Sequence, residues 1–319
     1  KASASGCAVA PAAPAAPTED GERGGAPTGG SRRDAYTART RLRRERKKQL
    51  KHTMYGDVAV LPPEDLLDPA EAAANAEALL QLQSVRSVAV YVRKGEGEGA
   101  DPARNVARHL AGDPSLEILY KESGVEFHVD LSRRLSRLCR AQGSSNERQR
   151  ICSLVRPGER VLVLASGIGL TPCLVGKHTE CDAVVGIERD PVAHEFAAGN
   201  IERNRLAGRV RSVVGDPFDT AGFGVFDRVC AFLPWQRGGV PLPLEDVMRP
   251  GVSVLASGGT LHVYSHESQE QYDAGPAEAE RAMANVCGSR GFALTWRGKV
   301  PRRPIGPNWY RIGLDFRLA

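Results

Sequence analysis

Two glycines and two acids stand where predicted strands end. Gly167 and Gly169 follow the apolar run RVLVLAS, Glu188 ends the run AVVGIE, and Asp216 ends the run VRSVVGD. Glycines let the backbone approach a ligand at the start of a helix, and an acid about 20 residues later can accept hydrogen bonds from both ribose hydroxyls. A second acid at the next strand end is placed to accept from an adenine amino group. With no phosphate-binding lysine motif, this pattern favours S-adenosylmethionine (SAM) over NAD or ATP, the alternative being a sheet with polar strand ends and no ligand.

The segment CAFLPWQ follows the next predicted strand. Class I methyltransferases that act on ring nitrogens commonly place Asn or Asp before a short apolar residue and Pro at this spot, where the polar side chain holds the edge of the base. Phe232 occupies this position and is followed by Leu233 and Pro234. We assign Leu233 and Pro234 to the cofactor pocket. Trp235 either stacks on a base or belongs to the core, and the sequence leaves both open.

The elements that must position these residues lie between residue 136 and the C-terminus. A helix is predicted at 146–159, and most of the strands that follow alternate with helices. This alternation predicts an α/β, Rossmann-like domain over 136–319, in which helices cover both faces of a parallel sheet. The last two strands, FALTWRGKV and WYRIGLDFRL, lack an intervening helix and are expected to pair antiparallel. A ligand would bind at the carboxyl ends of the parallel strands, where the strand order switches.

A smaller α+β domain is expected over 52–135. The segment MYGDVAVLP predicts one strand, and Asp68 followed by Pro69 predicts the start of a helix. VRSVAVYVRKG predicts a further strand. LEILYKESGVEFHVDLS predicts two strands joined by a tight turn at Glu122–Gly124.

Residues 1–51 form an arm of different composition. The first part is mostly Ala, Pro and Gly, which predicts disorder. Residues 32–51 hold ten Lys and Arg against Asp34 and Glu45, in a chain of net charge +5. Such an arm contacts nucleic acid through counterion release, the alternatives being a solvated flank or the remnant of a transit peptide. The candidate RNA contacts within it are Arg43, Arg44, Lys47 and Lys48.

The composition is that of a soluble globular protein, with 41% hydrophobic and 25% charged residues. No apolar run approaches the roughly 18 residues of a membrane span, so we expect no membrane partner. The seven cysteines show no CxxC pair and no zinc spacing, which predicts reduced, mostly inert thiols and no metal site. The chain begins with Lys1 and not with Met, so we expect a fragment or a processed product. We expect a cytoplasmic monomer, with a mitochondrial or nuclear pool left open.

From about Tyr55 to the C-terminus, the order and spacing of many segments resemble one family. They include YGDVAVLP, VRSVAVYVRKG, ARNVARHLAG, ILYKESGVEFHVDLS, NERQRICSLVRPGERVLVLASGIG, GIERDP, GNIERNRL, FDRVCAFLP, SGGTLHVYSH and NWYRIGLDFRL. The chain resembles the archaeal and eukaryotic tRNA guanine-37 N1-methyltransferases and the related aminocarboxypropyltransferases of wybutosine synthesis. The resemblance implies a small RNA-positioning domain in front of a Rossmann-like SAM domain, with tRNA as partner.

Residue by residue, the resemblance implies roles for several polar side chains. The family's Glu-Arg pair matches Glu147, a candidate proton acceptor, and Arg148, which we expect to contact RNA. The arginine that approaches the target base matches Arg104, with Arg108 as the near alternative. Arg140, in the segment CRAQGSS that displaces a shorter family segment, is also assigned to RNA.

Two residues depart from the family pattern. Val163 replaces the aspartate at the end of the first strand, which should weaken the hold on the cofactor. Phe232 replaces the asparagine that would hold the edge of guanine, and loss of such a bond costs about 2–4 kcal/mol in a transition state.

Three functions follow from this pattern. The leading one is methyl transfer to N1 of guanine 37 in tRNA. The second is aminocarboxypropyl transfer to the wybutosine precursor at position 37, because that branch also lacks the asparagine and the segment IERDP looks closer to it. The third is an RNA-binding or assembly module that keeps the fold and has lost the chemistry.

Overall fold

The structure, a computed structural model, describes residues 52–93, 105–133, 145–233, 236–237, 240–300 and 308–319. Several predicted site residues lie outside these ranges, namely Arg43, Arg44, Lys47, Lys48, Arg104, Arg140, Pro234 and Trp235. The arm over 1–51 also lies outside them, as does the predicted domain boundary at residue 135. Their predicted roles therefore stay predictions.

A seven-stranded sheet forms the centre of the C-terminal half, in the order β14-β15-β13-β10-β7-β8-β9. Its strands are β7 (Arg160–Leu164), β8 (Ala183–Glu188), β9 (Val210–Val214), β10 (Phe226–Ala231), β13 (Leu255–Ser268), β14 (Phe292–Lys299) and β15 (Trp309–Leu318). The five strands from β13 to β9 pair in parallel, whereas β15 pairs antiparallel with both β13 and β14. This confirms the Rossmann-like prediction and the antiparallel pairing of the last two strands.

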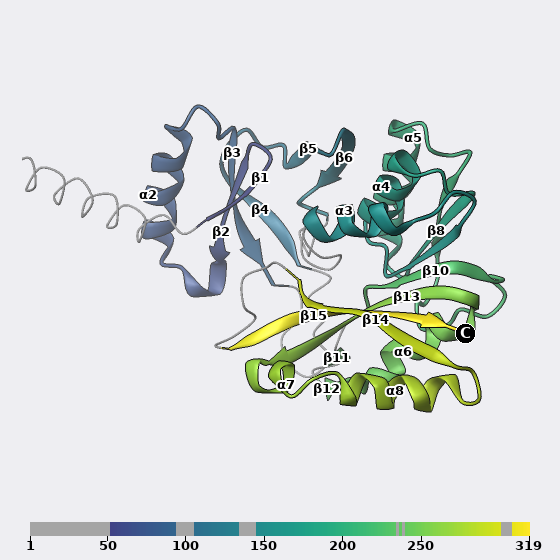
Figure 1. Ribbon diagram of the computed structural model, residues 1–319. Helices are drawn as coiled ribbons and strands as arrows, with labels where there is room; N and C mark the ends of the chain where they lie inside the picture. The colour runs from purple at the N-terminus through teal and green to yellow at the C-terminus, as the bar shows by residue number, and fades with distance from the viewer. Residues whose placement is uncertain (1–51, 94–104, 134–144, 234–235, 238–239, 301–307) are drawn as a thin grey trace, which may run out of the picture. The chain divides into compact units, whose positions relative to one another are not determined.

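Helices cover both faces of this sheet, as Figure 1 shows. One face carries α3 (Ser145–Leu154), α4 (Leu170–His178) and α5 (Pro191–Arg203); the other carries α6 (Leu244–Ser253) and α8 (Ala277–Cys287). Alternate residues of β7 point to opposite faces, because successive side chains of a strand alternate. Val163 therefore packs with α4 and α5, and Leu164 packs with α6 and α8.

Short elements complete this half of the chain. The strands β11 (Gln236–Arg237) and β12 (Val240–Pro241) pair with each other. The helix α7 (Gln269–Asp273) begins at Ser268, which caps it by accepting from the Gln271 N–H, while the Gln271 side chain accepts from the Ser268 N–H.

The strand order reverses between β7 and β10. From β7 the chain builds outward to β8 and β9 on one side, and then returns to add β10 and β13 on the other. In an open parallel sheet, the carboxyl ends of the two strands at such a reversal form a crevice that binds ligands. At these strand ends stand Ala165, which follows β7, and Phe232, which follows β10 and donates its N–H to the Leu164 carbonyl over 3.3 Å.

A four-stranded sheet, in the order β1-β2-β3-β4, lies nearer the N-terminus. Its strands are β1 (Thr53–Tyr55), β2 (Val58–Pro63), β3 (Ser87–Val92) and β4 (Val106–Gly112), with the short 3-10 helix η1 (Glu64–Leu66) after β2. The helix α2 (Pro69–Leu80) packs against it and begins as predicted, with Asp68 accepting from the Glu71 N–H over 3.0 Å. The prediction of one strand over 54–62 was wrong. Gly56, at φ +57, turns the chain back and makes a hairpin of β1 and β2.

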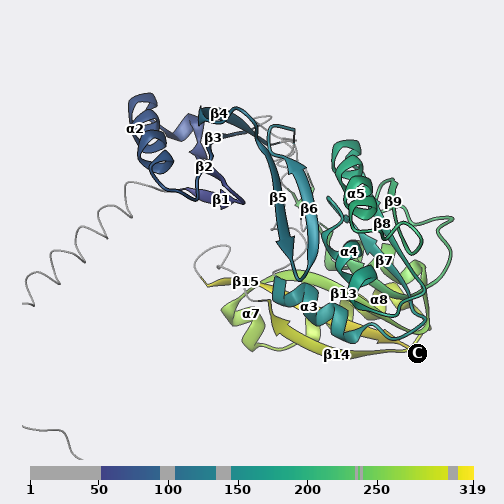
Figure 2. The same cartoon turned by 90° about the horizontal axis from the view of Figure 1, so that it is seen from above.

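The strands β5 (Glu117–Glu122) and β6 (Val125–Asp130) form a separate hairpin, with the turn at Ser123 and Gly124 that the sequence predicts. Figure 2 shows the hairpin running beside α5. Asn200 of α5 and Asn204, the C-cap of this helix, hold the backbone of β6: Asn200 Oδ1 accepts from the His128 N–H over 2.7 Å, and Asn204 Oδ1 accepts from the Glu126 N–H over 2.9 Å. By these contacts the hairpin is attached to the Rossmann-like domain.

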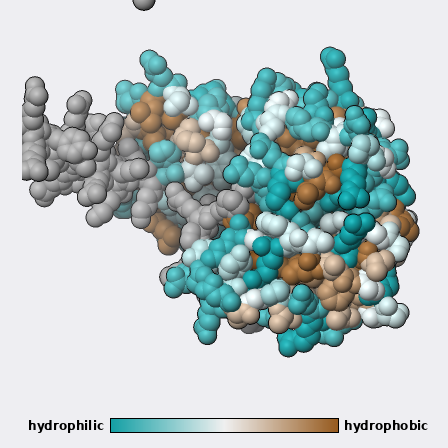
Figure 3. Space-filling model, in the orientation of Figure 1, coloured by the Kyte–Doolittle hydropathy of each residue, from teal (hydrophilic) through white to brown (hydrophobic). Residues whose placement is uncertain are grey.

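The face in Figure 3 is mostly hydrophilic, with its apolar side chains in small separate groups. Within the described ranges, no helix has both the length and the apolar character needed to cross a bilayer.

Candidate cofactor and transfer site

The turn after β7 has an unusual backbone. Ala165, Gly167 and Gly169 all have positive φ values, of 57°, 59° and 86°. Gly169 caps the N-terminus of α4, and a Cβ at that position would lie only 3.3 Å from Ala197 Cβ in α5. Glycine is therefore needed at 169 for both its conformation and its close packing. Sequence reasoning found the two glycines and missed Ala165, which takes a conformation that glycine adopts more easily.

Glu188 lies directly beside this turn. Its carboxylate accepts from the Gly167 N–H over 2.8 Å at Oε2 and from the Asp190 N–H over 3.0 Å at Oε1. The side chain is only 6% exposed. A carboxylate oxygen can accept two hydrogen bonds, so ribose hydroxyls can share both oxygens with these amides. The structure thus brings Gly167, Gly169 and Glu188 together as the sequence predicts.

Asp216 follows β9 at the neighbouring strand end and is exposed. Its Oδ1 accepts from the Phe218 N–H over 3.0 Å, which closes a tight turn. The preceding Gly215 donates its N–H to the Glu188 carbonyl over 3.1 Å. The two acids therefore stand on adjacent strand ends, in the order that the ribose and base of an adenosine require.

The donors and acceptors at this edge fit the adenosine half of SAM. The glycine turn allows close approach, and Glu188 supplies a buried acceptor. The other half of the pocket departs from the expected pattern. Val163 is fully buried within β7, and Leu233 packs its side chain in the core with Leu164. A contact from Leu233 to a cofactor would therefore come from its backbone.

Phe232 is held in an aromatic pair. Its ring stacks on Tyr264 of β13, with ring centroids 5.0 Å apart and planes 13° from parallel. The Arg311 guanidinium lies over the Tyr264 ring at 4.5 Å, and Phe232 is only 3% exposed. Phe232 is thus a packed apolar wall at the end of β10, with no polar group to offer to a base.

Tyr264 joins this wall to Glu147 on α3. The Tyr264 hydroxyl donates to Glu147 Oε1 over 2.7 Å, and Glu147 is 2% exposed. Burial, followed by the charge of Glu147, raises the pKa of the Tyr264 phenol well above its ordinary value. The phenol therefore stays protonated and acts as the donor.

Glu147 belongs to a buried network of charged groups. Arg150 donates Nε to Glu147 Oε2 over 2.9 Å and Nη2 to Glu147 Oε1 over 2.7 Å. Its Nη1 donates to Asp315 Oδ2 on β15 over 2.6 Å, and the guanidinium lies 3.8 Å from the ring of Trp296. Burial lowers the pKa of Arg150, but its hydrogen bonds to Glu147 and Asp315 outweigh burial and raise it above its ordinary value.

The network continues from Asp315 to a buried histidine. His262 Nδ1 lies 2.6 Å from Asp315 Oδ1, and its Nε2 lies 2.7 Å from Arg228 Nη1. Because a guanidinium only donates, Nε2 must accept and Nδ1 must carry the proton toward Asp315. Burial would raise the pKa of Asp315, but hydrogen bonds from His262 and Arg150 hold it below its ordinary value. Sequence reasoning missed Tyr264 and His262, which lie on β13, and Asp315, which lies on β15.

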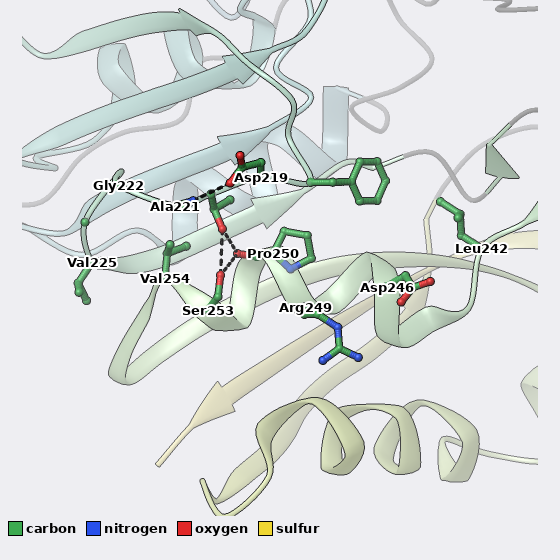
Figure 4. A pocket seen from close by; sticks show the side chains of 13 residues that line it. Asp219, Ala221, Gly222, Val225, Leu242, Asp246, Arg249, Pro250, Ser253 and Val254 are labelled. Carbon is green, nitrogen blue, oxygen red and sulfur yellow. Dashed lines mark hydrogen bonds between the residues drawn. The ribbon is translucent and has the colours of Figure 1, made fainter.

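A groove of about 870 Å³ lies elsewhere, between α6 and the loop after β9 (Figure 4). Two hydroxyls in its lining are engaged with the backbone, because Thr220 and Ser253 both donate to the Pro250 carbonyl, over 3.0 and 2.9 Å. Phe218 lines it two residues beyond Asp216, but the described residues around it include neither the glycine turn nor Glu188. This groove is therefore distinct from the predicted pocket.

The described cysteines are free thiols, and four of the five are buried. Burial raises the pKa of Cys152 to about 11 and that of Cys173 to about 12, so both stay protonated near neutral pH, in agreement with the prediction of inert thiols. Cys7 and Cys139 lie outside the described residues. In the part of the chain that the structure describes, no group of His, Cys, Asp and Glu is arranged to hold a metal ion.

The TRM5/TYW2 methyltransferase domain matches residues 118–283, which is more than half of the chain. The chain belongs to the TRM5/TYW2 methyltransferase family. The resemblance predicted from the sequence is thereby confirmed, and the matched residues include all of the hairpin β5–β6 except Glu117.

Relatives within the TRM5/TYW2 family modify position 37 of tRNA. The tRNA (guanine(37)-N(1))-methyltransferase Trm5b of Pyrococcus abyssi is 25% identical over 231 residues, which span 72% of this chain and 64% of that protein. The tRNA(Phe) (4-demethylwyosine(37)-C(7)) aminocarboxypropyltransferase of Methanocaldococcus jannaschii is 25% identical over 180 residues, 56% of this chain and 66% of that protein. The chain thus spans somewhat less than two thirds of the length of the Trm5b relative.

Solved structures confirm the fold of this TRM5/TYW2 member. Trm5b from P. abyssi matches with a TM-score of 0.66 and 21% identity, over 86% of this chain and 78% of that one. TYW2 from P. horikoshii, solved in complex with MeSAdo, matches with a TM-score of 0.64 and 21% identity, over 90% of this chain and 98% of that one.

The structure contradicts one role that the TRM5/TYW2 resemblance implied. Arg148, expected to contact RNA, is 3% exposed, and its guanidinium pairs with Glu122 at the end of β5 over 2.6 and 2.7 Å. A buried and paired guanidinium cannot reach a phosphate, so Arg148 fastens α3 to the hairpin instead. Arg108, the alternative to Arg104, is exposed on β4 and pairs with Glu64 over 2.6 Å.

Proposed function

We propose that this protein is a SAM-dependent transferase that modifies the purine at position 37 of tRNA, with methyl transfer to N1 of guanine as the leading reaction. The observation that carries the proposal is the contact between Glu188 and the Gly167 N–H at the strand-order reversal, with Asp216 on the next strand end. Relatives that act on guanine 37, such as Trm5b of P. abyssi, support the choice of reaction.

Different residues at this edge of the sheet bind different parts of the cofactor. Glu188 accepts from the ribose hydroxyls, and Asp216 accepts from the adenine amino group. The glycine turn leaves room for the backbone to approach, Leu233 offers its backbone after β10, and Pro234 is retained as a predicted cofactor contact. When bound, SAM supplies an electrophilic carbon next to its sulfonium. The chain contributes position, orientation and exclusion of water around that carbon.

A second reaction is favoured by one specific observation. Phe232 is packed flat against Tyr264 and offers no hydrogen bond to the edge of guanine. A stacked aromatic wall suits a larger, more apolar tricyclic base, whose contact comes from buried area and not from edge bonding. This geometry favours aminocarboxypropyl transfer to the wybutosine precursor, the activity named for the relative in M. jannaschii. Loss of chemistry with retained RNA binding remains the third alternative.

The partner in each reaction is tRNA. We retain Arg104 as the residue that approaches the target base, and Arg140 together with Arg43, Arg44, Lys47 and Lys48 as phosphate contacts. Backbone phosphate contacts of this kind give affinity without sequence preference and make it dependent on salt. We also retain the proposals of a monomer and of a cytoplasmic location.

Product analysis tests the proposal. The full chain is incubated with SAM and either an unmodified tRNA that carries guanine 37 or a tRNA that carries the wybutosine precursor, and nucleoside 37 is analysed by mass spectrometry. We expect a methyl group on guanine 37. An aminocarboxypropyl group on the precursor alone would establish the second reaction. No mass gain on either tRNA would overturn the proposal.

Two substitutions at Phe232 separate the reactions further. Both Phe232→Asn and Phe232→Leu lose the ring that stacks on Tyr264, but only Asn adds an amide for the edge of the base. For guanine methylation, Asn should exceed Leu in rate by about thirtyfold or more, because one such hydrogen bond is worth about 2–4 kcal/mol in a transition state. For the precursor, Leu should equal or exceed Asn. Equal methylation rates for the two variants would contradict an edge contact at this position.

A further inference from the structure

Glu147, the candidate proton acceptor, is already engaged on both carboxylate oxygens. Oε1 accepts from Tyr264 Oη and from Arg150 Nη2, each over 2.7 Å, and Oε2 accepts from Arg150 Nε over 2.9 Å. With a guanidinium in bidentate contact and only 2% of the residue exposed, the carboxylate faces protein groups. A general base must instead lie within hydrogen-bond reach of the proton that it removes.

Arg150 is fixed in turn from the C-terminal strand. Asp315 on β15 accepts from Arg150 at both oxygens, over 2.6 and 3.2 Å, and His262 on β13 holds Asp315 over 2.6 Å. The Trp296 ring of β14 lies against the same guanidinium. Three strands therefore determine where Arg150 stands, and Arg150 determines the orientation of the Glu147 carboxylate.

The orientation of the Glu147 carboxylate in turn fixes the position of Tyr264. Glu147 holds its hydroxyl, and the ring that is held there is the one on which Phe232 stacks, at 5.0 Å. Phe232 stands directly after β10, at the strand-order reversal where the target base would meet the cofactor. The carboxylate thus reaches the proposed site through two side chains and not directly.

We propose that Glu147 is a positioning residue, which holds Tyr264 and through it the Phe232 wall, and that it is not the group that accepts the proton of the base. Arg150 and Asp315 belong to the same unit, because they hold the carboxylate in place. The inference rests on the proposed transferase function, since it concerns the wall of that site.

A double-mutant cycle tests the inference. Glu147→Gln, Glu147→Ala, Tyr264→Phe and the double variant Glu147→Ala/Tyr264→Phe are made in the full chain. Gln149→Ala, at an exposed position of the same helix, serves as the control. For each protein, kcat and KM are measured across pH on the tRNA that the wild type modifies, and the affinity for S-adenosylhomocysteine shows whether the cofactor site is intact.

A positioning role predicts a distinct pattern. The Gln amide oxygen still accepts from Tyr264, so Glu147→Gln should lose less than about tenfold in kcat and keep the pH profile of the wild type, whereas loss of a general base costs about a hundredfold or more. Glu147→Ala and Tyr264→Phe both break the same hydrogen bond. The double variant should therefore be no slower than the slower of the two single variants, because contacting residues are not additive.

The opposite pattern overturns the inference. If Glu147→Gln loses about a hundredfold with a changed pH profile, or if the effects of Glu147→Ala and Tyr264→Phe multiply, then Glu147 acts independently of Tyr264 and is the better candidate for the base. Should Glu147→Ala fail to fold, Glu147→Gln and its pH profile still decide. A wild type that binds S-adenosylhomocysteine but modifies neither tRNA would instead refute the proposed function, and the inference would fall with it.

Discussion

Ala165 has a backbone conformation that is unfavourable for a residue with a Cβ. Its φ of 57° lies in the left-handed region, as do those of Gly167 and Gly169 in the same turn. For a residue with a Cβ, this conformation costs about 1–2 kcal/mol relative to glycine. The turn keeps it because the backbone between β7 and α4 must bring the Gly167 N–H to Glu188.

Replacement of Ala165 by glycine should therefore stabilise the protein. Relief of the strain outweighs the extra freedom that glycine gives the unfolded chain, about 0.4–1 kcal/mol, so we expect a net gain of up to about 1 kcal/mol. Chemical denaturation of the full chain measures the change. Gly169→Ala is the matched control and should destabilise, because its φ is 86° and the new Cβ would press against Ala197. A loss of stability in Ala165→Gly would show that the turn is not strained.

The helix α5 contacts both the hairpin β5–β6 and the glycine turn. Asn200 is 1% exposed and bonds to three backbone groups: the His128 N–H and carbonyl of β6, and the Ile168 carbonyl of the glycine turn over 3.0 Å. Asn204, one turn later, bonds to the Glu126 N–H and carbonyl of the same strand. One helix therefore holds the hairpin, and its first asparagine also holds the cofactor turn.

Substitutions distinguish the role of Asn200 from that of Asn204. Asn200→Ala and Asn204→Ala should each destabilise the protein by about 1–3 kcal/mol, because both leave backbone groups of β6 without their partners. Only Asn200→Ala should also weaken the binding of S-adenosylhomocysteine, by severalfold, since only it releases the Ile168 carbonyl. Thermal unfolding and calorimetry on the two variants check this. Equal cofactor affinities would mean that the turn holds its shape without Asn200.

The sequence predicts elements better than it predicts their contacts. The alternation of strands and helices, the cap at Asp68 and the turn at Ser123 and Gly124 are local signals, and the structure confirms them. The reversal of the chain at Gly56 was missed, because apolar residues continue through β2 and read as one strand. Tyr264, which bonds to Glu147, and Asp315, which bonds to Arg150, were missed because they lie on β13 and β15, more than 100 residues away along the chain.

The position of the candidate cofactor site depends on the strand order of the whole seven-stranded sheet. Each predicted strand was visible locally, but the order that puts β7 between β8 and β10 depends on how the strands pair. That order brings the ends of β7, β8, β9 and β10 to one edge and so gathers Gly167, Glu188, Asp216 and Phe232. Val163 and Phe232, the two residues that depart from the family pattern, are both buried in the core beneath this edge.

The decisive measurement is a calorimetric titration of the full chain with S-adenosylhomocysteine, made in parallel on Glu188→Ala. We expect the wild type to bind, and Glu188→Ala to bind more weakly by about 1.5–3 kcal/mol, or roughly 10- to 150-fold, because it loses hydrogen bonds to a charged group. Asp182→Ala, an exposed acid just before the same strand, should bind like the wild type. Absence of binding by the wild type, or equal affinity in Glu188→Ala, would contradict the assignment of this edge as the SAM site.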